Sequence, residues 1–137
     1  MQAQVAQAQE FLASGGPGST TLPLVWAGDF NSDADATTVT GIVPDTATYQ
    51  NIVGAGLRDT WAAVNPGDPG YTCCEAANLD NPLPTLDERI DHVFTRGPWQ
   101  AVNATIVGAS PADKTASNRW PSDHAGVLAK LNLQGQS

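Results

Sequence analysis

The chain has 137 residues, 14 acidic against 6 basic side chains and a formal net charge of -8, and its length suits one modest domain. This acidic balance argues against a large nucleic-acid interface, because proteins bind phosphate backbones through basic surfaces. An apolar fraction of 41% with four tryptophans predicts a packed core rather than disorder. No apolar run is long enough to span a membrane, and the start at Met1 lacks the basic and apolar regions of a signal peptide.

The chain contains two cysteines, Cys73 and Cys74, which are neighbours in the sequence. Neighbouring cysteines bridge each other only with strain, so a small scaffold held together by disulfides is excluded. The cysteine spacing of a zinc site is also absent. Cysteine usage leaves the redox compartment open.

The first part of the chain predicts one helix followed by one strand. Apolar residues recur at helical spacing over residues 1–13, and a Gly-rich loop follows. Residues 24–27 form a short apolar run between Pro23 and Gly28, which predicts a buried strand over residues 22–27. Residues 45–63 predict two helical pieces interrupted by Gly54 and Gly56, the second of them beginning at Leu57.

The second part predicts a long connection and three strands. Residues 72–86 show little periodicity and contain two prolines, so we expect a long surface excursion of the kind that often carries function. Alternating apolar residues predict strands over residues 88–95, 100–109 and 125–133. Helices layered on strands predict an α/β or α+β domain, and no linker divides residues 1–137.

Polar residues directly follow the predicted strand over residues 22–27. Asp29 and Asn31 lie two positions apart and therefore point the same way. A carboxylate there can accept a proton or orient a water, and a carboxamide can donate to a phosphate oxygen or help hold a hard cation. The simpler alternative is a turn that ends the strand.

Two further clusters surround Asp91 and the pair Asp123 and His124. A strand carboxylate such as Asp91 needs a partner, and either a nearby arginine (Arg89 or Arg96) or His124 can supply it. A carboxylate that holds one imidazole nitrogen leaves the other free for proton transfer or hydrogen bonding. Asp123 suits a hard cation, although Ser122 and Asp123 also suit a turn. We expect His92 to have a packing or surface role, because strand alternation turns it away from Asp91.

Three motifs in this order resemble the C-terminal motifs of the endonuclease/exonuclease/phosphatase superfamily. This superfamily includes exonuclease III, pancreatic deoxyribonuclease and neutral sphingomyelinases. The stretches around residues 70–74 and 86–89 look most similar to bacterial members that are often exported, which is consistent with secretion of full-length relatives. The motifs are Gly28-Asp29-Phe30-Asn31, Arg89-Ile90-Asp91-His92-Val93-Phe94 and Ser122-Asp123-His124.

The resemblance implies a metal-dependent phosphoesterase that uses Mg²⁺, Mn²⁺ or Ca²⁺. Asp29 would orient or deprotonate the attacking water, Asn31 would hold the scissile phosphate, and Asp91 would pair with His124. His124 would bind the phosphate or act as an acid or base. Asp123, with Asp29 and Asn31, would bind the metal.

The resemblance covers only part of the family domain. Family members have about twice this length, and their N-terminal half supplies a metal-binding Glu and a catalytic His that this chain lacks. Residues 1–137 are therefore expected to form the C-terminal half of a four-layer α/β sandwich. This half would consist of a mostly antiparallel sheet with helices on one face.

The missing half leaves several outcomes open. The chain would be inactive or weak alone, and a homodimer or a complementing N-terminal half would complete the site. The alternative is an inactive phosphate-binding, metal-binding or assembly module. A phosphate ester is the expected substrate, and the acidic charge of the chain makes nucleic acid a less favoured one.

Overall fold

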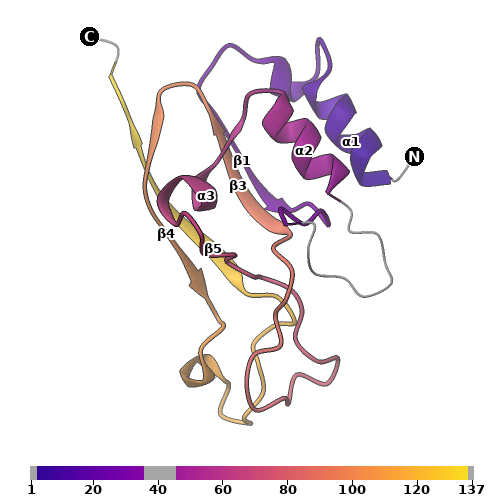
Figure 1. Cartoon of the computed structure of the whole chain (residues 1–137), viewed down its shortest axis with the longest axis vertical. Coiled ribbons are helices and arrows are strands. Elements are labelled where there is room, and N and C mark those ends of the chain that lie inside the picture. The colour runs from indigo at the N-terminus through magenta and orange to yellow at the C-terminus, as the bar shows by residue number, and fades with distance from the viewer. Residues whose placement is uncertain (1–2, 36–45, 136–137) are drawn as a thin grey trace.

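The computed structural model describes residues 3–35 and 46–135. The first two positions of the predicted N-terminal helix and Asp45 lie outside this part of the chain. Two 3₁₀ turns, Pro17–Ser19 and Pro111–Asp113, accompany the main elements. These are α1 (Ala3–Leu12), β1 (Leu24–Asp29), α2 (Ala47–Gly54), β2 (Arg58–Asp59), α3 (Thr60–Val64), β3 (Asp91–Arg96), β4 (Trp99–Val107) and β5 (Gly126–Leu133) (Figure 1).

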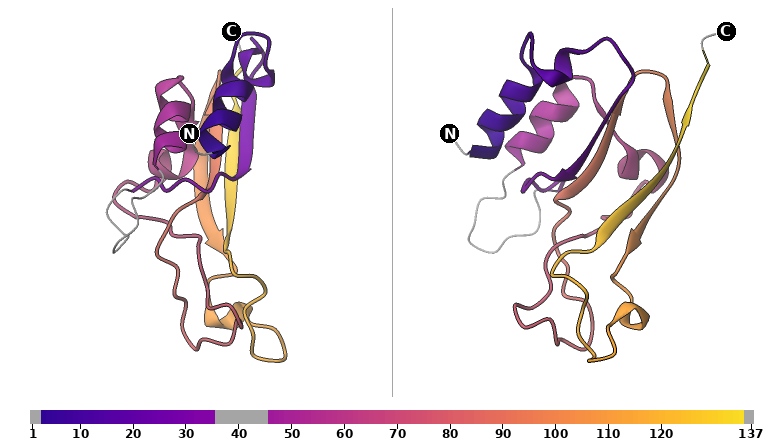
Figure 2. Two further views of the ribbon diagram at one scale, coloured as in Figure 1. Left: turned by 90° about the vertical axis from the view of Figure 1, so that its right-hand side faces the viewer. Right: turned by 180° about the vertical axis from the view of Figure 1, so that it is seen from behind.

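All the described strands pair in antiparallel fashion. They form a three-stranded group in the order β1-β3-β2 and a separate hairpin of β4 and β5. Helices α1 and α2 lie side by side next to β1 and β3 (Figure 2). This arrangement confirms the predicted α/β class, with the strands divided into two hydrogen-bonded groups. No helix in the described ranges has the length and apolar character needed to cross a bilayer.

Aromatic side chains build the core between the two helices and strands β1 and β3. Phe94 of β3 and Ile52 of α2 have no exposed surface. Phe11 of α1 stacks on Trp26 of β1 with ring centroids 3.8 Å apart, and Phe30 meets Phe94 edge-on at 5.2 Å. Such ring contacts add to the free energy of burial, and here they attach α1 to the strand that leads into Asp29.

The prediction of a buried strand over residues 22–27 is wrong, because only one face of β1 packs against the core. This strand pairs only with β3 and forms one edge of its sheet. Leu24 and Trp26 face the core, whereas Val25 is 41% exposed and Ala27 is also exposed. Because side chains alternate along a strand, Asp29 shares the face of Val25 and Ala27, which the helices leave uncovered.

The predicted second helical piece begins later than expected. Leu57 lies buried in the core outside any helix, and the short strand β2 follows it. The carboxylate of Asp59 then accepts hydrogen bonds from the backbone N–H groups of Trp61 and Ala62. This N-cap starts α3 at Thr60, because a side-chain acceptor satisfies N–H groups that have no partner within the helix.

The segment over residues 72–86 is only partly a surface excursion. Thr72, Cys73 and Glu75 are all buried, whereas residues 82–85 are exposed. The backbone of Cys73 forms isolated β-bridges to Glu88 and to His124. The start of this segment therefore connects the residues before β3 with those before β5, and it brings two of the predicted clusters together.

Candidate functional site

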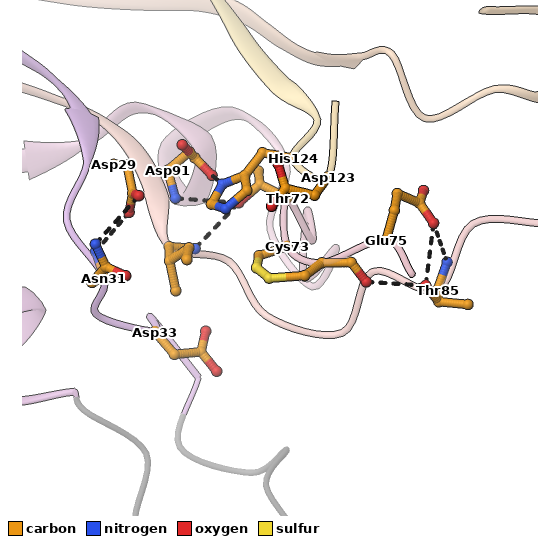
Figure 3. The surroundings of a disulfide bond; sticks show 12 residues. Asp29, Asn31, Asp33, Thr72, Cys73, Glu75, Thr85, Asp91, Asp123 and His124 are labelled. Carbon is orange, nitrogen blue, oxygen red and sulfur yellow. Dashed lines mark hydrogen bonds and ion pairs between the residues drawn. A yellow bond between two sulfur atoms is a disulfide. The ribbon is translucent and has the colours of Figure 1, made fainter. Parts of the chain in front are cut away.

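Asp91 and His124 form the centre of the candidate site. Asp91 begins β3, and His124 lies two residues before β5. The Nδ1 atom of His124 lies 2.9 Å from Oδ2 of Asp91, with both side chains partly exposed (Figure 3). When Nδ1 donates this hydrogen bond, Nε2 is left for a ligand, which is the geometry of a carboxylate-oriented imidazole.

The arginines that could have paired with Asp91 make other contacts. Arg89 Nη1 lies 2.6 Å from Oδ2 of Asp59, and both side chains are buried. Arg96 donates to the backbone carbonyls of Gly18 and Thr20. Among the alternatives open from the sequence, the structure therefore places His124 beside Asp91.

The surrounding charges favour the protonated form of His124. Burial alone would lower the pKa of this imidazole, but the hydrogen bond to Asp91 and the negative charge of Asp91 act in the opposite direction. The charges of Asp29 and Asp123 add to this effect, and together they raise the pKa of His124 above its ordinary value. A protonated imidazole among carboxylates is suited to hold a phosphate oxygen or to donate a proton.

Asp29 and Asn31 form a turn at the end of β1. The backbone N–H of Asn31 donates to Oδ1 of Asp29 at 2.8 Å, and the Asn31 amide donates to Oδ2 at 3.3 Å. Asn31 has a positive φ of 47°, a conformation that asparagine tolerates better than most residues. The turn interpretation is thus correct, and the same turn holds both polar side chains at the exposed end of the strand.

Asp123 has a fixed backbone and an exposed carboxylate. Its carbonyl oxygen accepts a hydrogen bond from the backbone N–H of Glu75 at 2.8 Å. The Ser122 hydroxyl lies 3.3 Å from Oδ1 of Asp123 and also accepts from the N–H of His124. The predicted turn is therefore present, and the carboxylate stays accessible to a cation.

Two hollows adjoin these residues. A hollow of about 130 Å³ lies beside Asp91 and is lined by residues of β1, β3 and β5. A larger one of about 330 Å³ reaches Asp29 and Asn31 at the end of β1 and has aromatic walls. The smaller is lined by Ala27, Gly28, Asp91, His92, Val93 and Val127, and the larger includes Phe11, Trp26 and Phe30.

The donor set suits a hard divalent cation in part. Asp29, Asn31 and Asp123 offer oxygen ligands, and Mg²⁺ is commonly held by one or two carboxylates together with waters and substrate phosphates. Within residues 3–35 and 46–135, the one group of three or more His, Cys, Asp or Glu side chains at metal-binding separation is Cys73, Cys74 and His124. Asp29 and Asp123 therefore do not belong to such a group among the described residues, although each carboxylate could supply one oxygen ligand.

Thr72 is a supporting residue that the sequence did not reveal. Its buried hydroxyl accepts hydrogen bonds from the backbone N–H groups of Ile90 and Asp91, both at 3.2 Å. Its carbonyl accepts from the N–H of Ala125 at 2.8 Å. Thr72 thus ties the start of β3 to the residue after His124, and contacts this distant in sequence leave no local pattern.

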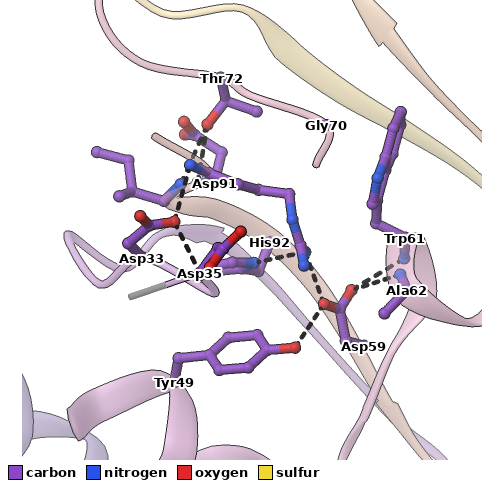
Figure 4. Close-up of polar contacts among 12 residues, drawn as sticks. Asp33, Asp35, Tyr49, Asp59, Trp61, Ala62, Gly70, Thr72, Asp91 and His92 are labelled. Carbon is purple, nitrogen blue, oxygen red and sulfur yellow. Dashed lines mark hydrogen bonds and ion pairs between the residues drawn. The ribbon is translucent and has the colours of Figure 1, made fainter. Parts of the chain in front are cut away.

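A buried polar network supports β3 from the core side (Figure 4). Asp59 accepts from Arg89 and from the hydroxyl of Tyr49, the latter at 2.9 Å. His92 is buried, as the packing interpretation predicted, with Nε2 2.9 Å from the carbonyl of Ser32. Burial and the charge of Arg89 lower the pKa of His92, so it stays neutral within the core.

Comparisons with known proteins agree with this architecture. Residues 2–124 match the sequence model of the Endonuclease/Exonuclease/phosphatase family. An endonuclease/exonuclease/phosphatase from Beutenbergia cavernae is 30% identical, with a TM-score of 0.56 over 83% of this chain. D. rerio TDP2, solved with a single-stranded DNA product, is 19% identical, with a TM-score of 0.61 over 96% of this chain.

A mannosyl-6-phosphatase from Bacteroides thetaiotaomicron is 22% identical, with a TM-score of 0.50 over 93% of this chain. No curated protein sequence matches. This chain spans 27% of the length of the Beutenbergia cavernae protein, 50% of TDP2 and 42% of the mannosyl-6-phosphatase. The match over residues 2–124 shows that the chain belongs to the endonuclease/exonuclease/phosphatase family.

Proposed function

We propose that this chain carries one wall of the active site of a divalent-metal-dependent phosphoester hydrolase. The observation that carries the proposal is the hydrogen bond between Asp91 and His124, with Asp29 close enough to raise the pKa of the imidazole. Phosphoester hydrolysis needs a prepared water, a group that holds the phosphoryl oxygens and an acid for the leaving group. The carboxylate of Asp29, the amide of Asn31 and the imidazole of His124 have the chemical properties that these three tasks require.

Asp29 and Asn31 would act on the side of the attacking water. The exposed Asp29 carboxylate, fixed by the turn at the end of β1, would orient the water and accept its proton. The Asn31 amide would donate to a phosphoryl oxygen, exchanging its 3.3 Å contact with Asp29 for the substrate.

His124 would act on the phosphate or on the leaving group. Asp91 holds Nδ1, so Nε2 would donate to a phosphoryl oxygen or protonate the departing oxygen. Asp123, together with Asp29 and Asn31, would hold Mg²⁺, Mn²⁺ or Ca²⁺. Such a cation neutralises charge on the phosphoryl oxygens when it is bound.

A second surface would complete the site. The chain spans half or less of its solved relatives, and Val25 and Ala27 lie exposed on the same face as Asp29. An apolar surface beside a partial site favours completion by a second chain segment. That segment would be a complementing N-terminal half of the domain or, in a homodimer, another copy of this chain.

The test is a hydrolysis assay on the folded chain with Mg²⁺ or with EDTA. The substrates would be a chromogenic phosphodiester, a chromogenic phosphomonoester, sphingomyelin and plasmid DNA. Because a second surface would complete the site, turnover by this chain alone should be weak. We expect that turnover to need Mg²⁺ and to fall at least about 100-fold in Asp29→Ala and in His124→Ala. The exposed Asp80 is the matched acidic control, and Asp80→Asn should leave turnover unchanged. Turnover that resists EDTA or survives both site substitutions would contradict the proposal.

The second candidate is an inactive phosphate-binding or metal-binding module, and the incomplete carboxylate set favours it. Calorimetry would separate the two functions. Mg²⁺ binding that is weakened by Asp123→Asn, without hydrolysis of any of the four substrates, supports the module. Light scattering on the same sample would show whether a homodimer accompanies any activity.

A further inference from the structure

Two sulfur atoms lie beside the imidazole of the candidate site. Cys73 and Cys74 are joined by a disulfide, and their sulfurs and a ring nitrogen of His124 all lie within 4.8 Å of one another (Figure 3). The backbone bridge between Cys73 and His124 fixes this proximity. The hydrolase chemistry proposed above uses neither sulfur.

We propose that reduction of this disulfide creates a site for a soft divalent cation, with both thiolates and Nε2 of His124 as ligands. Thiolate and imidazole donors select zinc-like ions over Mg²⁺ or Ca²⁺, which prefer oxygen ligands. Two sulfurs and one nitrogen supply three of the four positions that zinc takes, and water can supply the fourth. Its ligand atoms differ from the carboxylate oxygens of Asp29 and Asp123.

The hydrogen bond of His124 prepares it for this role. Nδ1 is held 2.9 Å from the carboxylate of Asp91, so Nε2 is the nitrogen that remains for a metal. Metal-bound histidines commonly have such a carboxylate behind them, because it fixes the ring and strengthens the nitrogen donor. Asp29 and Asp123 add negative charge that favours a cation at this position.

The two cysteines differ in their exposure to solvent, and this difference suits them to different roles in the proposed metal site. Cys73 is 2% exposed, and its backbone is hydrogen-bonded to Glu88. Cys74 is exposed, so a reductant and a metal ion can reach its sulfur from solvent. One ligand is therefore held by the fold, and the other can adjust to the distance that a bound ion requires.

Formation of the site is a balanced redox reaction. A water-soluble phosphine attacks one sulfur and breaks the S–S bond, and water then converts the phosphine to its oxide and leaves two thiols. The disulfide gains two electrons and the phosphine loses two. When the ion binds, each thiol releases its proton, and the imidazole binds through its neutral nitrogen.

The experiment uses Cd²⁺ as a spectroscopic probe, with the whole chain reduced by the phosphine. We expect one Cd²⁺ per chain, an ultraviolet sulfur-to-cadmium charge-transfer band, and no band in the oxidised chain. Zn²⁺ should raise the unfolding temperature of the reduced chain only. Circular dichroism before each titration establishes that the reduced chain is folded.

Substitutions test each part of the site. His124→Ala should weaken Cd²⁺ binding at least about 10-fold, and Asp91→Asn about 10- to 100-fold. Cys74→Ser, at an exposed position, should abolish the one-to-one complex. The Asp80→Asn variant should bind Cd²⁺ as the unsubstituted chain does. A folded, reduced chain without the band would overturn the proposal, as would binding that is unaffected by His124→Ala.

This test is independent of the hydrolase proposal, because it needs neither substrate nor Mg²⁺. If both proposals hold, an ion on Nε2 of His124 would keep that nitrogen from the phosphate. Zn²⁺ should then inhibit hydrolysis by the reduced chain more strongly than by the oxidised chain. Loss of hydrolysis with intact Cd²⁺ binding would contradict only the enzymatic function.

Discussion

Asp29 and Asp91 lie directly opposite each other in the antiparallel ladder between β1 and β3. Like charges at directly opposed positions destabilise a sheet. The imidazole of His124, bound to Asp91 and influenced by both carboxylates, offsets part of this repulsion. A fold that keeps two carboxylates together at an exposed strand end is typical of a site that handles cations or protons.

The first prediction concerns this repulsion. Asp29→Asn should raise the free energy of unfolding by about 0.2 to 1 kcal/mol, because it removes one of the opposed charges and keeps an oxygen acceptor for the turn. Urea unfolding at neutral pH measures the change. Asp29→Ala is the control: it removes the charge and the acceptor for the N–H of Asn31, so it should be less stable than Asp29→Asn. Equal stability of the two variants would contradict the assigned role of the turn.

The second prediction concerns the pKa of His124. Asp91→Asn should lower this pKa, because the carboxylate favours the charged imidazole through a hydrogen bond and its negative charge. The chain has two histidines, so NMR titration of the ring protons can follow both. Asp80→Asn should leave the titration unchanged, and an unchanged midpoint in Asp91→Asn would show that this pair does not set the pKa.

These shifts fix the sign of the pH dependence. Since folding raises the pKa of His124, its contribution to stability is fully present below the ordinary value near 6.5 and is lost as the pH rises through the folded value. His92 has the opposite shift, so its contribution is present above 6.5 and is lost as the pH falls through its lowered folded pKa. Asp91→Asn should therefore reduce stability mainly on the acidic side.

The third prediction concerns the hydroxyl of Thr72. Thr72→Val keeps the shape of the side chain but leaves the N–H groups of Ile90 and Asp91 without their acceptor, at a cost of about 1 to 3 kcal/mol. Thr72→Ser retains the oxygen and should lose less stability. Hydrogen exchange at the amide of Asp91 is the direct measurement, and we expect faster exchange in Thr72→Val only.

The elements that could be predicted from the sequence are those with a local periodicity of apolar residues. The spacing of apolar residues in α1 and the alternation in β5 are properties of neighbouring positions, so each can be read without a tertiary structure. The order of the three motifs likewise indicated that Asp29, Asp91 and His124 belong to one site. Their roles in catalysis stay predictions.

The features that could not be predicted depend on contacts between segments that are distant in the sequence. Arg89 was one proposed partner of Asp91, but the chain brings Asp59 to it from 30 positions away. Thr72 is buried because it contacts the residues before β3 and β5. These contacts leave no periodic pattern in the sequence around Thr72. Likewise, Leu57 has a helical pattern around it, yet the N-cap at Asp59 determines where α3 begins.

The fourth prediction concerns the buried pair of Asp59 and Arg89. Asp59→Asn should lower the free energy of unfolding by about 3 to 5 kcal/mol, because it leaves the guanidinium without its counter-charge in the core. Tyr49→Phe removes one hydrogen bond to the same carboxylate and should cost about 1.5 to 3 kcal/mol. Thermal unfolding of the two variants side by side compares the two contributions. A smaller loss in Asp59→Asn than in Tyr49→Phe would contradict the importance of the ion pair.

The fifth prediction concerns Gly70, which has a positive φ of 63° and lies against the indole of Trp61. A methyl group at this position would overlap the Trp61 ring, and the indole is held by a hydrogen bond of 2.9 Å to the carbonyl of Asp68. Gly70→Ala should therefore cost about 1 to 3 kcal/mol for overpacking, in addition to the strain of the positive φ. Tryptophan fluorescence during urea unfolding measures the loss. Gly67→Ala separates the two causes, because Gly67 also has a positive φ of 86° but has open space around the new methyl group. If both variants lose the same stability, backbone strain is the whole effect and the contact with Trp61 contributes nothing.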